Sequence, residues 1–137
     1  MRSPFGEPDW QPPSTNILLI DDEEDILFTF NEGLASEGYN VEAFIDPTEA
    51  FTHFVNVNPS HFNLAILDIR MPGLNGLQLY YRLKAINRNI KILFVSALDA
   101  VPELISILPG VKTTNGIIKK PVALDDFIMA VKTALVQ

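Results

Sequence analysis

Residues 16–25 read NILLIDDEED, and this stretch decides the predicted fold. Its four apolar residues, 17–20, form a continuous run rather than an alternating pattern, which is typical of a strand buried on both faces of a parallel sheet. Five acids follow directly, so the run ends abruptly in charge. We therefore expect a central parallel strand whose carboxyl end carries a group of carboxylates.

Four further apolar runs follow along the chain, at 41–45, 64–67, 90–95 and 117–118. Between and after them lie five helical patterns, at 26–37, 47–57, 75–86, 102–108 and 124–135, with apolar residues at a spacing near 3.6. Such alternation requires parallel strands joined by crossover helices on both faces. The sequence predicts an α/β fold with a doubly wound, five-stranded parallel sheet.

Length and composition predict one folded domain preceded by an arm. The chain has 137 residues, of which 47% are hydrophobic and 20% charged, and these values exclude a wholly disordered chain. Residues 1–15 contain four of the ten prolines, which fix φ and remove backbone donors. We expect a flexible Pro-rich arm over 1–15 and the domain over 16–137.

The charge and the cysteine count exclude several functions. Ten Lys and Arg against 17 Asp and Glu give a net charge of −7, and such a surface repels nucleic-acid phosphates and anionic lipids. With no cysteine, disulfides and thiol chemistry are excluded. No apolar run approaches the roughly 18 residues of a membrane span. We expect a cytoplasmic protein without direct nucleic-acid or membrane partners.

The predicted strand ends bring polar residues to one edge of the sheet. Asp21 and Asp22 follow the first strand, Asp68 the third, Ser96 the fourth, and Lys120 ends the fifth. In a doubly wound sheet this carboxyl edge is where ligands bind. Crowded carboxylates raise one another's pKa or cost stability, and Mg²⁺ relieves this. We predict an acidic Mg²⁺ pocket that Lys120 faces.

The acids that follow this pocket have a simpler interpretation. Glu23, Glu24 and Asp25 precede an amphipathic pattern, and acids at a helix N-terminus favour the helix dipole. We assign these three to the start of the first helix. His53 and His61 are isolated in sequence, without enough further ligands for zinc, and we interpret them as surface histidines.

Four motifs in order resemble the receiver domain of two-component response regulators, over residues 16–136. They are Asp21-Asp22-Glu23, residues 67–76 (LDIRMPGLNG), Val95-Ser96-Ala97 and Lys120-Pro121. The resemblance implies flavodoxin-like topology with strand order 2-1-3-4-5. It also implies that the Lys120–Pro121 peptide bond is cis.

The resemblance assigns roles to the residues at the sheet edge. It implies that Asp68 is the phosphoacceptor and that Asp22, Asp68 and the Arg70 backbone carbonyl bind Mg²⁺, with Asp21 acting through water. Ser96 and Lys120 are then expected to contact the phosphoryl oxygens. This chemistry relies on positioning and charge neutralisation, which a metal ion and a lysine supply.

The resemblance also implies partners and a mode of action. The phosphoryl donor is expected to be a sensor histidine kinase or a histidine phosphotransfer protein, and the recipient of the signal a downstream effector protein. A homodimer through the fourth helix, fifth strand and fifth helix is expected, since Val101, Leu104, Ile105 and Leu108 form an apolar face. Such a domain is not an enzyme in the usual sense, because it catalyses only its own phosphorylation and dephosphorylation.

Two positions bear on how the domain is coupled to its partners. Ile117 stands where the family usually carries a switching aromatic residue, so we expect coupling mainly through Ser96 and the following loop. Weaker phosphorylation-linked amide NMR shifts in Ser96→Ala would support this. Phe28 lies about 140° from the centre of the first helix's apolar stripe and is expected to be exposed for docking of the phosphodonor.

Three other functions are less well supported by the site residues. An aspartyl phosphatase needs an acid two residues after its nucleophile, where this chain has Arg70. An FMN binder needs a phosphate loop where Asp21–Asp25 would repel the phosphate. The third is a degenerate receiver that acts as a phosphate-independent protein-interaction module. The complete set of acids with Ser96 and Lys120 argues against it.

Overall fold

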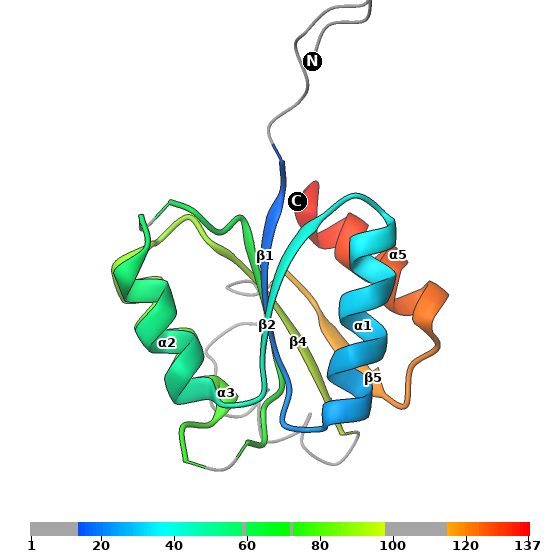
Figure 1. Cartoon of the computed structure of the whole chain (residues 1–137), viewed down its shortest axis with the longest axis horizontal. Helices are drawn as coiled ribbons and strands as arrows, with labels where there is room; N and C mark the ends of the chain where they lie inside the picture. Colours follow the sequence, from blue (N-terminus) through cyan, green and yellow to red (C-terminus); the bar gives the residue numbers. More distant parts are fainter. Residues whose placement is uncertain (1–13, 59, 72, 98–114) are drawn as a thin grey trace, which may run out of the picture.

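A computed structural model describes residues 14–58, 60–71, 73–97 and 115–137 (Figure 1). Several expected features lie outside these residues. They are most of the Pro-rich arm, the fourth helix with its apolar face, and the loop after Ala97 that was expected to transmit the signal.

The described strands form one parallel sheet of the predicted order, β2-β1-β3-β4-β5. Their bounds are β1 Asn16–Ile20, β2 Asn40–Phe44, β3 Leu64–Leu67, β4 Lys91–Ala97 and β5 Ile117–Lys120. Every residue of β3 is buried, as expected for a central strand covered on both faces. The predicted fold class is therefore confirmed.

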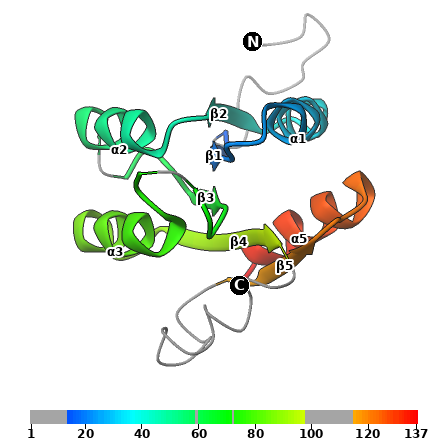
Figure 2. The same ribbon diagram turned by 90° about the horizontal axis from the view of Figure 1, so that it is seen from below.

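Four described helices cover the two faces of the sheet: α1 Glu24–Ser36, α2 Pro47–Asn56, α3 Gly76–Ile86 and α5 Leu124–Leu135. Figure 2 shows α1 and α5 on one face and α2 and α3 on the other. Each pair packs on its own apolar cluster. Phe30 of α1 stacks on Phe127 of α5 with ring centroids 3.8 Å apart, which joins the two helices on their face. No helix in the described ranges is long and apolar enough to cross a membrane.

Local signals set the starts of two helices. The Asp46 side chain accepts a hydrogen bond from the Thr48 N–H at 2.8 Å, and Pro47 opens α2. Asn75 and Gln78 form a reciprocal capping box at the start of α3. These caps fix where α3 begins relative to the end of β3, beside the candidate site.

The bounds of four strands differ by one or two residues from the predicted apolar runs, and β2 and β4 illustrate why. β2 ends at Phe44, and Ile45 beyond it is 46% exposed, since it lies past the sheet in the turn toward α2. β4 runs on to Ala97, because its pairing with β5 extends through Ser96 and Lys119. Ser96 therefore lies within the strand rather than after it.

Candidate functional site

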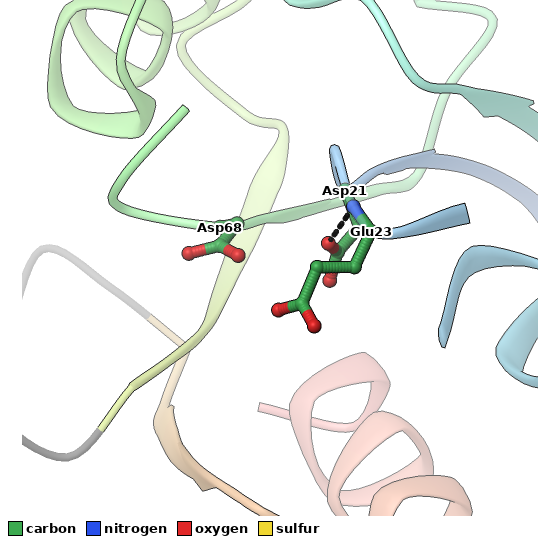
Figure 3. Close-up of side chains that lie close together, drawn as sticks. All are labelled: Asp21, Glu23 and Asp68. Atoms are coloured by element: carbon green, nitrogen blue, oxygen red, sulfur yellow. Dashed lines mark hydrogen bonds between the residues drawn. The ribbon is translucent and has the colours of Figure 1, made fainter. Parts of the chain in front are cut away.

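The carboxyl edge of the sheet holds the three buried polar side chains found among the described residues. Asp21 follows β1 and is 3% exposed, Asp68 follows β3 and is 5% exposed, and Ser96 of β4 is fully buried. Figure 3 shows the carboxylates of Asp21 and Asp68 close together, with that of Glu23 beside them. Burying charge is costly unless it is paired, so the carboxylates of Asp21 and Asp68 require a cationic partner.

Lys120, the last residue of β5, supplies that partner. Its Nζ lies 2.7 Å from Asp21 Oδ2, 2.8 Å from Asp68 Oδ2 and 3.0 Å from Glu23 Oε1. The Lys120 side chain is itself only 10% exposed. One ammonium therefore faces three carboxylates, which leaves the cluster with an excess of negative charge.

Three donors hold the Asp68 carboxylate in place. Its Oδ1 accepts from Ser96 Oγ at 3.0 Å and from the Arg70 backbone N–H at 3.2 Å. Its Oδ2 accepts from Lys120 Nζ at 2.8 Å. The donors come from β4, β5 and the chain just after β3, so the sheet itself positions this carboxylate.

The pKa values of Asp21 and Lys120 are both raised in this site. Burial raises the pKa of Asp21, although the hydrogen bonds from Lys120 and from the Glu23 N–H oppose the shift. Burial acts to lower the pKa of Lys120, but the hydrogen bonds to Asp21, Asp68 and Glu23 outweigh it and raise the pKa above its ordinary value. Lys120 therefore remains an ammonium at neutral pH.

The acidic cluster has the chemistry of a site for a hard divalent cation. Ligand oxygens of Asp21, Glu23 and Asp68 all lie within 4.8 Å of one another. Carboxylate oxygens are the ligands that Mg²⁺ takes in proteins, together with water and phosphate oxygens. The residues present therefore fit the ion that the sequence predicted.

The membership of this cluster differs from the sequence expectation at one position. Glu23, which we assigned to the helix start, occupies the third place, while Asp22 is half-buried and does not belong to the cluster found among the described residues. Glu23 is the N-cap of α1 but makes no side-chain capping bond. Its N–H donates to Asp21 Oδ1 at 2.9 Å. An Asp whose carboxylate can accept from the N–H two residues on is the local sequence signal that would have predicted this turn.

Gly76 packs the start of α3 against the backbone of Asp68. A Cβ built at Gly76 would lie 2.0 Å from the Asp68 carbonyl oxygen, and the Gly76 N–H donates to Ile69 O at 2.9 Å. No side chain fits in this contact without moving backbone. The segment between β3 and α3 is therefore held close to the candidate site.

Four further residues for which the sequence analysis stated or implied a role or a conformation lie outside the acidic cluster or at its edge. The Lys120–Pro121 bond is cis, as the resemblance implied, and Lys119 is exposed. Ile117 is partly buried and packs against the apolar cluster under α2 and α3. Phe28 is 66% exposed on α1, as expected, while its docking role stays a prediction.

An acidic cluster with two buried members and one lysine, at the carboxyl edge of a parallel 2-1-3-4-5 sheet, defines a class of α/β domain. Residues 17–132 match the model of the response regulator receiver domain, and the chain belongs to this family. It is therefore a receiver domain of the kind found in two-component systems.

Curated relatives and solved structures agree with this assignment. The chain is 28% identical over 122 residues to the transcriptional regulatory protein PrrA of Mycobacterium leprae, with 89% of the chain and 50% of the relative covered. It is 29% identical over 119 residues to the response regulator MprA of Mycobacterium sp. (strain KMS), with 87% and 50% covered. The chain thus spans about half the length of these relatives.

Solved receiver structures are similar in fold. The non-phosphorylated HemR receiver domain from Leptospira biflexa has a TM-score of 0.78 and 26% identity, with 90% of this chain and 96% of that one covered. The response regulator TrrA from Thermotoga maritima, in complex with Mg²⁺ and BeF, has a TM-score of 0.73 and 27% identity, with 88% and 98% covered.

Proposed function

We propose that this receiver domain accepts a phosphoryl group on Asp68. The observation that carries the proposal is the position of the Asp68 carboxylate, buried at the sheet edge and bonded to Lys120 and Ser96. A carboxylate that accepts hydrogen bonds on both oxygens is held in a fixed orientation, as a nucleophile requires. Its neighbours supply the donors that a transferred phosphoryl group needs.

In the proposed step, an Asp68 carboxylate oxygen attacks the phosphorus of a phosphohistidine. The new O–P bond forms as the P–N bond breaks, and the imidazole leaves with the electron pair of that bond and takes up a proton. The product is an acyl phosphate on Asp68. Lys120 and Ser96, which bond the Asp68 oxygens beforehand, then donate to phosphoryl oxygens.

The acidic cluster is proposed to hold Mg²⁺. Asp21, Glu23 and Asp68 are supported as ligands by their proximity, whereas the family resemblance supports Asp22 and the Arg70 carbonyl, with Asp21 acting through water. When bound, the ion neutralises charge on the phosphoryl oxygens and the carboxylates. The residues' own contribution is to hold the acceptor carboxylate and to exclude bulk water from it.

The proposed partners are those of a receiver domain. A sensor histidine kinase or a histidine phosphotransfer protein would supply the phosphoryl group, and an effector protein or effector domain would receive the signal. We propose a cytoplasmic location, dimerisation through the face of the fourth helix, fifth strand and fifth helix, and no catalysis beyond self-phosphorylation and self-dephosphorylation. PrrA and MprA are named as regulators. Because this chain matches only half of their length, a regulatory activity like that of the whole relatives is part of the proposal.

The second candidate is a degenerate receiver that signals without phosphate. The set of Asp21, Asp68, Ser96 and Lys120 favours phosphorylation over this alternative, because their side chains are joined in one network. A domain that had lost phosphorylation would not require this network to persist.

Beryllofluoride binding, followed by amide NMR, tests the proposal. We expect Mg²⁺-dependent shifts in the wild type at Ser96 and Lys120, and none in Asp68→Asn. Asp22→Asn and Glu23→Gln then identify the metal ligand, since the variant that lacks a direct ligand needs more Mg²⁺ for the same response. No response from a folded wild type at saturating Mg²⁺ would favour the degenerate receiver.

A further inference from the structure

The two histidines of the chain contact one carboxylate, Glu42, which is not part of the acidic cluster. His53 Nε2 lies 2.6 Å from Glu42 Oε1, and His61 Nε2 lies 3.0 Å from Glu42 Oε2. Glu42 belongs to the edge strand β2, His53 to the last turn of α2, and His61 to the segment before β3. The fold therefore creates a grouping of two imidazoles and a carboxylate that is not visible in the sequence.

Hydrogen bonds and regular structure position the backbones that carry these side chains. Glu42 pairs with Leu18 in the β1–β2 register. The His61 N–H donates to Asn58 O at 2.8 Å, and its carbonyl accepts from Asn16 Nδ2 at 3.0 Å. His53 lies within a regular helix. Glu42 and His53 thus lie in regular elements, and two backbone hydrogen bonds hold His61 in the segment before β3.

Aromatic rings flank both imidazoles. The His53 ring lies 5.4 Å from the ring of Phe44 and 6.1 Å, edge-on, from the ring of Phe62. The His61 ring contacts Phe62 edge-on at 4.7 Å. Both imidazoles therefore pack beside aromatic rings with Nε2 near Glu42, while the three side chains remain 34–37% exposed and free to rotate.

We propose that His53, His61 and Glu42 form a binding site for a late first-row divalent cation such as Zn²⁺. Imidazole nitrogen and carboxylate oxygen are the ligands that Zn²⁺ takes in proteins, and water completes an open site. Mg²⁺ instead prefers oxygen ligands alone, so this site is chemically distinct from the acidic cluster. The proposal is independent of phosphorylation at Asp68.

Cation binding requires a local rearrangement of side chains. Each imidazole contacts a different oxygen of Glu42, and among the described residues only the acidic cluster has three carboxylate or imidazole ligand atoms within 4.8 Å of one another. The bound ion replaces the two imidazole–carboxylate hydrogen bonds and draws the imidazoles together by rotation about their side-chain bonds. The ion would link α2, β2 and the segment before β3.

The chain offers a clean test because it has two histidines and no cysteine. Zn²⁺ is titrated into tag-free protein with a chromophoric chelator as competitor, with excess Mg²⁺ present to occupy the acidic cluster. We expect one Zn²⁺ per wild-type chain and at least a tenfold loss of affinity in His53→Gln and in His61→Gln. Asp68→Asn, folded and lacking an acidic ligand, is the matched control and should bind Zn²⁺ as the wild type does.

A second measurement does not depend on any variant. Added Ni²⁺ should broaden the ring NMR signals of His53 and His61 in the wild type at substoichiometric amounts, before any signal near Asp68.

Equal Zn²⁺ affinity in the wild type and both histidine variants would overturn the proposal. So would loss of Zn²⁺ binding in Asp68→Asn alone, which would place the ion in the acidic cluster.

Discussion

At the scale of single residues, Lys120 sets the charge balance of the candidate site. Its Nζ lies within 3.0 Å of carboxylate oxygens of Asp21, Glu23 and Asp68, and the side chains of Asp21 and Asp68 are almost fully buried. Removing one partner from a buried ion pair leaves an uncompensated charge, which is far more costly than removing a surface pair. The metal-free protein therefore depends on this lysine.

We predict that Lys120→Met lowers the free energy of unfolding by about 3 kcal/mol without Mg²⁺. Saturating Mg²⁺ should recover part of the loss, because the ion neutralises the same carboxylates. Urea denaturation with and without Mg²⁺ measures both effects. Lys119→Met is the matched control, because Lys119 is next to Lys120 in sequence but its side chain is exposed. This variant should change stability little. Equal losses in the two variants would contradict this account of Lys120.

Lys84 carries a pH-dependent prediction at the same scale. Burial lowers its pKa below the ordinary 10.5, and its Nζ donates to Ile90 O at 2.6 Å. The unfolded chain then binds more protons than the native state between the lowered pKa and 10.5, so the native state gains stability as pH rises through this window. The wild type should gain stability relative to Lys84→Met as pH rises toward 10.5. Denaturation of both proteins at several alkaline pH values measures this, and a constant difference would contradict it.

At the scale of elements, the start of α3 is built against the end of β3. The Gly76 position has no room for a side chain, because a Cβ would lie 2.0 Å from the Asp68 carbonyl oxygen. A methyl group there must displace the backbone of the residue that we propose as phosphoacceptor. Strain of this kind typically costs 1–3 kcal/mol.

Gly76→Ala is therefore expected to lose about 2 kcal/mol of stability and to be phosphorylated more slowly by acetyl phosphate. Gly33→Ala is the matched control, since it is also a helical glycine, but its Cβ meets only the flexible end of the Leu124 side chain at 2.6 Å. That variant should keep the wild-type phosphorylation rate. Denaturation and intact-mass time courses give the two readouts. A normal rate in Gly76→Ala would remove the link between this contact and Asp68.

The outer face of α1 carries the docking prediction. Phe28 is 66% exposed there, on the helix that begins beside the acidic cluster. We predict that Phe28→Ala slows transfer from a phosphohistidine-carrying protein by about tenfold, as loss of an interface anchor does. Transfer from acetyl phosphate should not change. Met129→Ala on α5, at 62% exposure, is the control, and an equal effect in both variants would exclude specific docking through Phe28.

At the scale of the whole molecule, the fold was predictable because buried parallel strands appear in the sequence as short apolar runs. The same topology brings Asp21, Asp68, Ser96 and Lys120 to one edge, so their proximity followed from strand order alone. The place of Glu23 was not predictable in this way, since it depends on how the chain turns after β1.

The contact of both histidines with Glu42 also could not be predicted from the sequence. It depends on how α2 packs over β2 and on the path of the chain before β3. The periodicity of apolar residues in the sequence predicts neither of these. Strand bounds differed for a similar reason, since pairing with β5 carries β4 past the apolar run that marks it.

Intact-mass spectrometry after incubation with acetyl phosphate tests the central claim most directly. Wild type and Asp68→Asn are compared with and without Mg²⁺. The account predicts one phosphoryl adduct on the wild type, dependent on Mg²⁺ and absent from Asp68→Asn. An adduct of the same amount on folded Asp68→Asn, or none on folded wild type with Mg²⁺, would contradict the assignment of Asp68 as the phosphoacceptor.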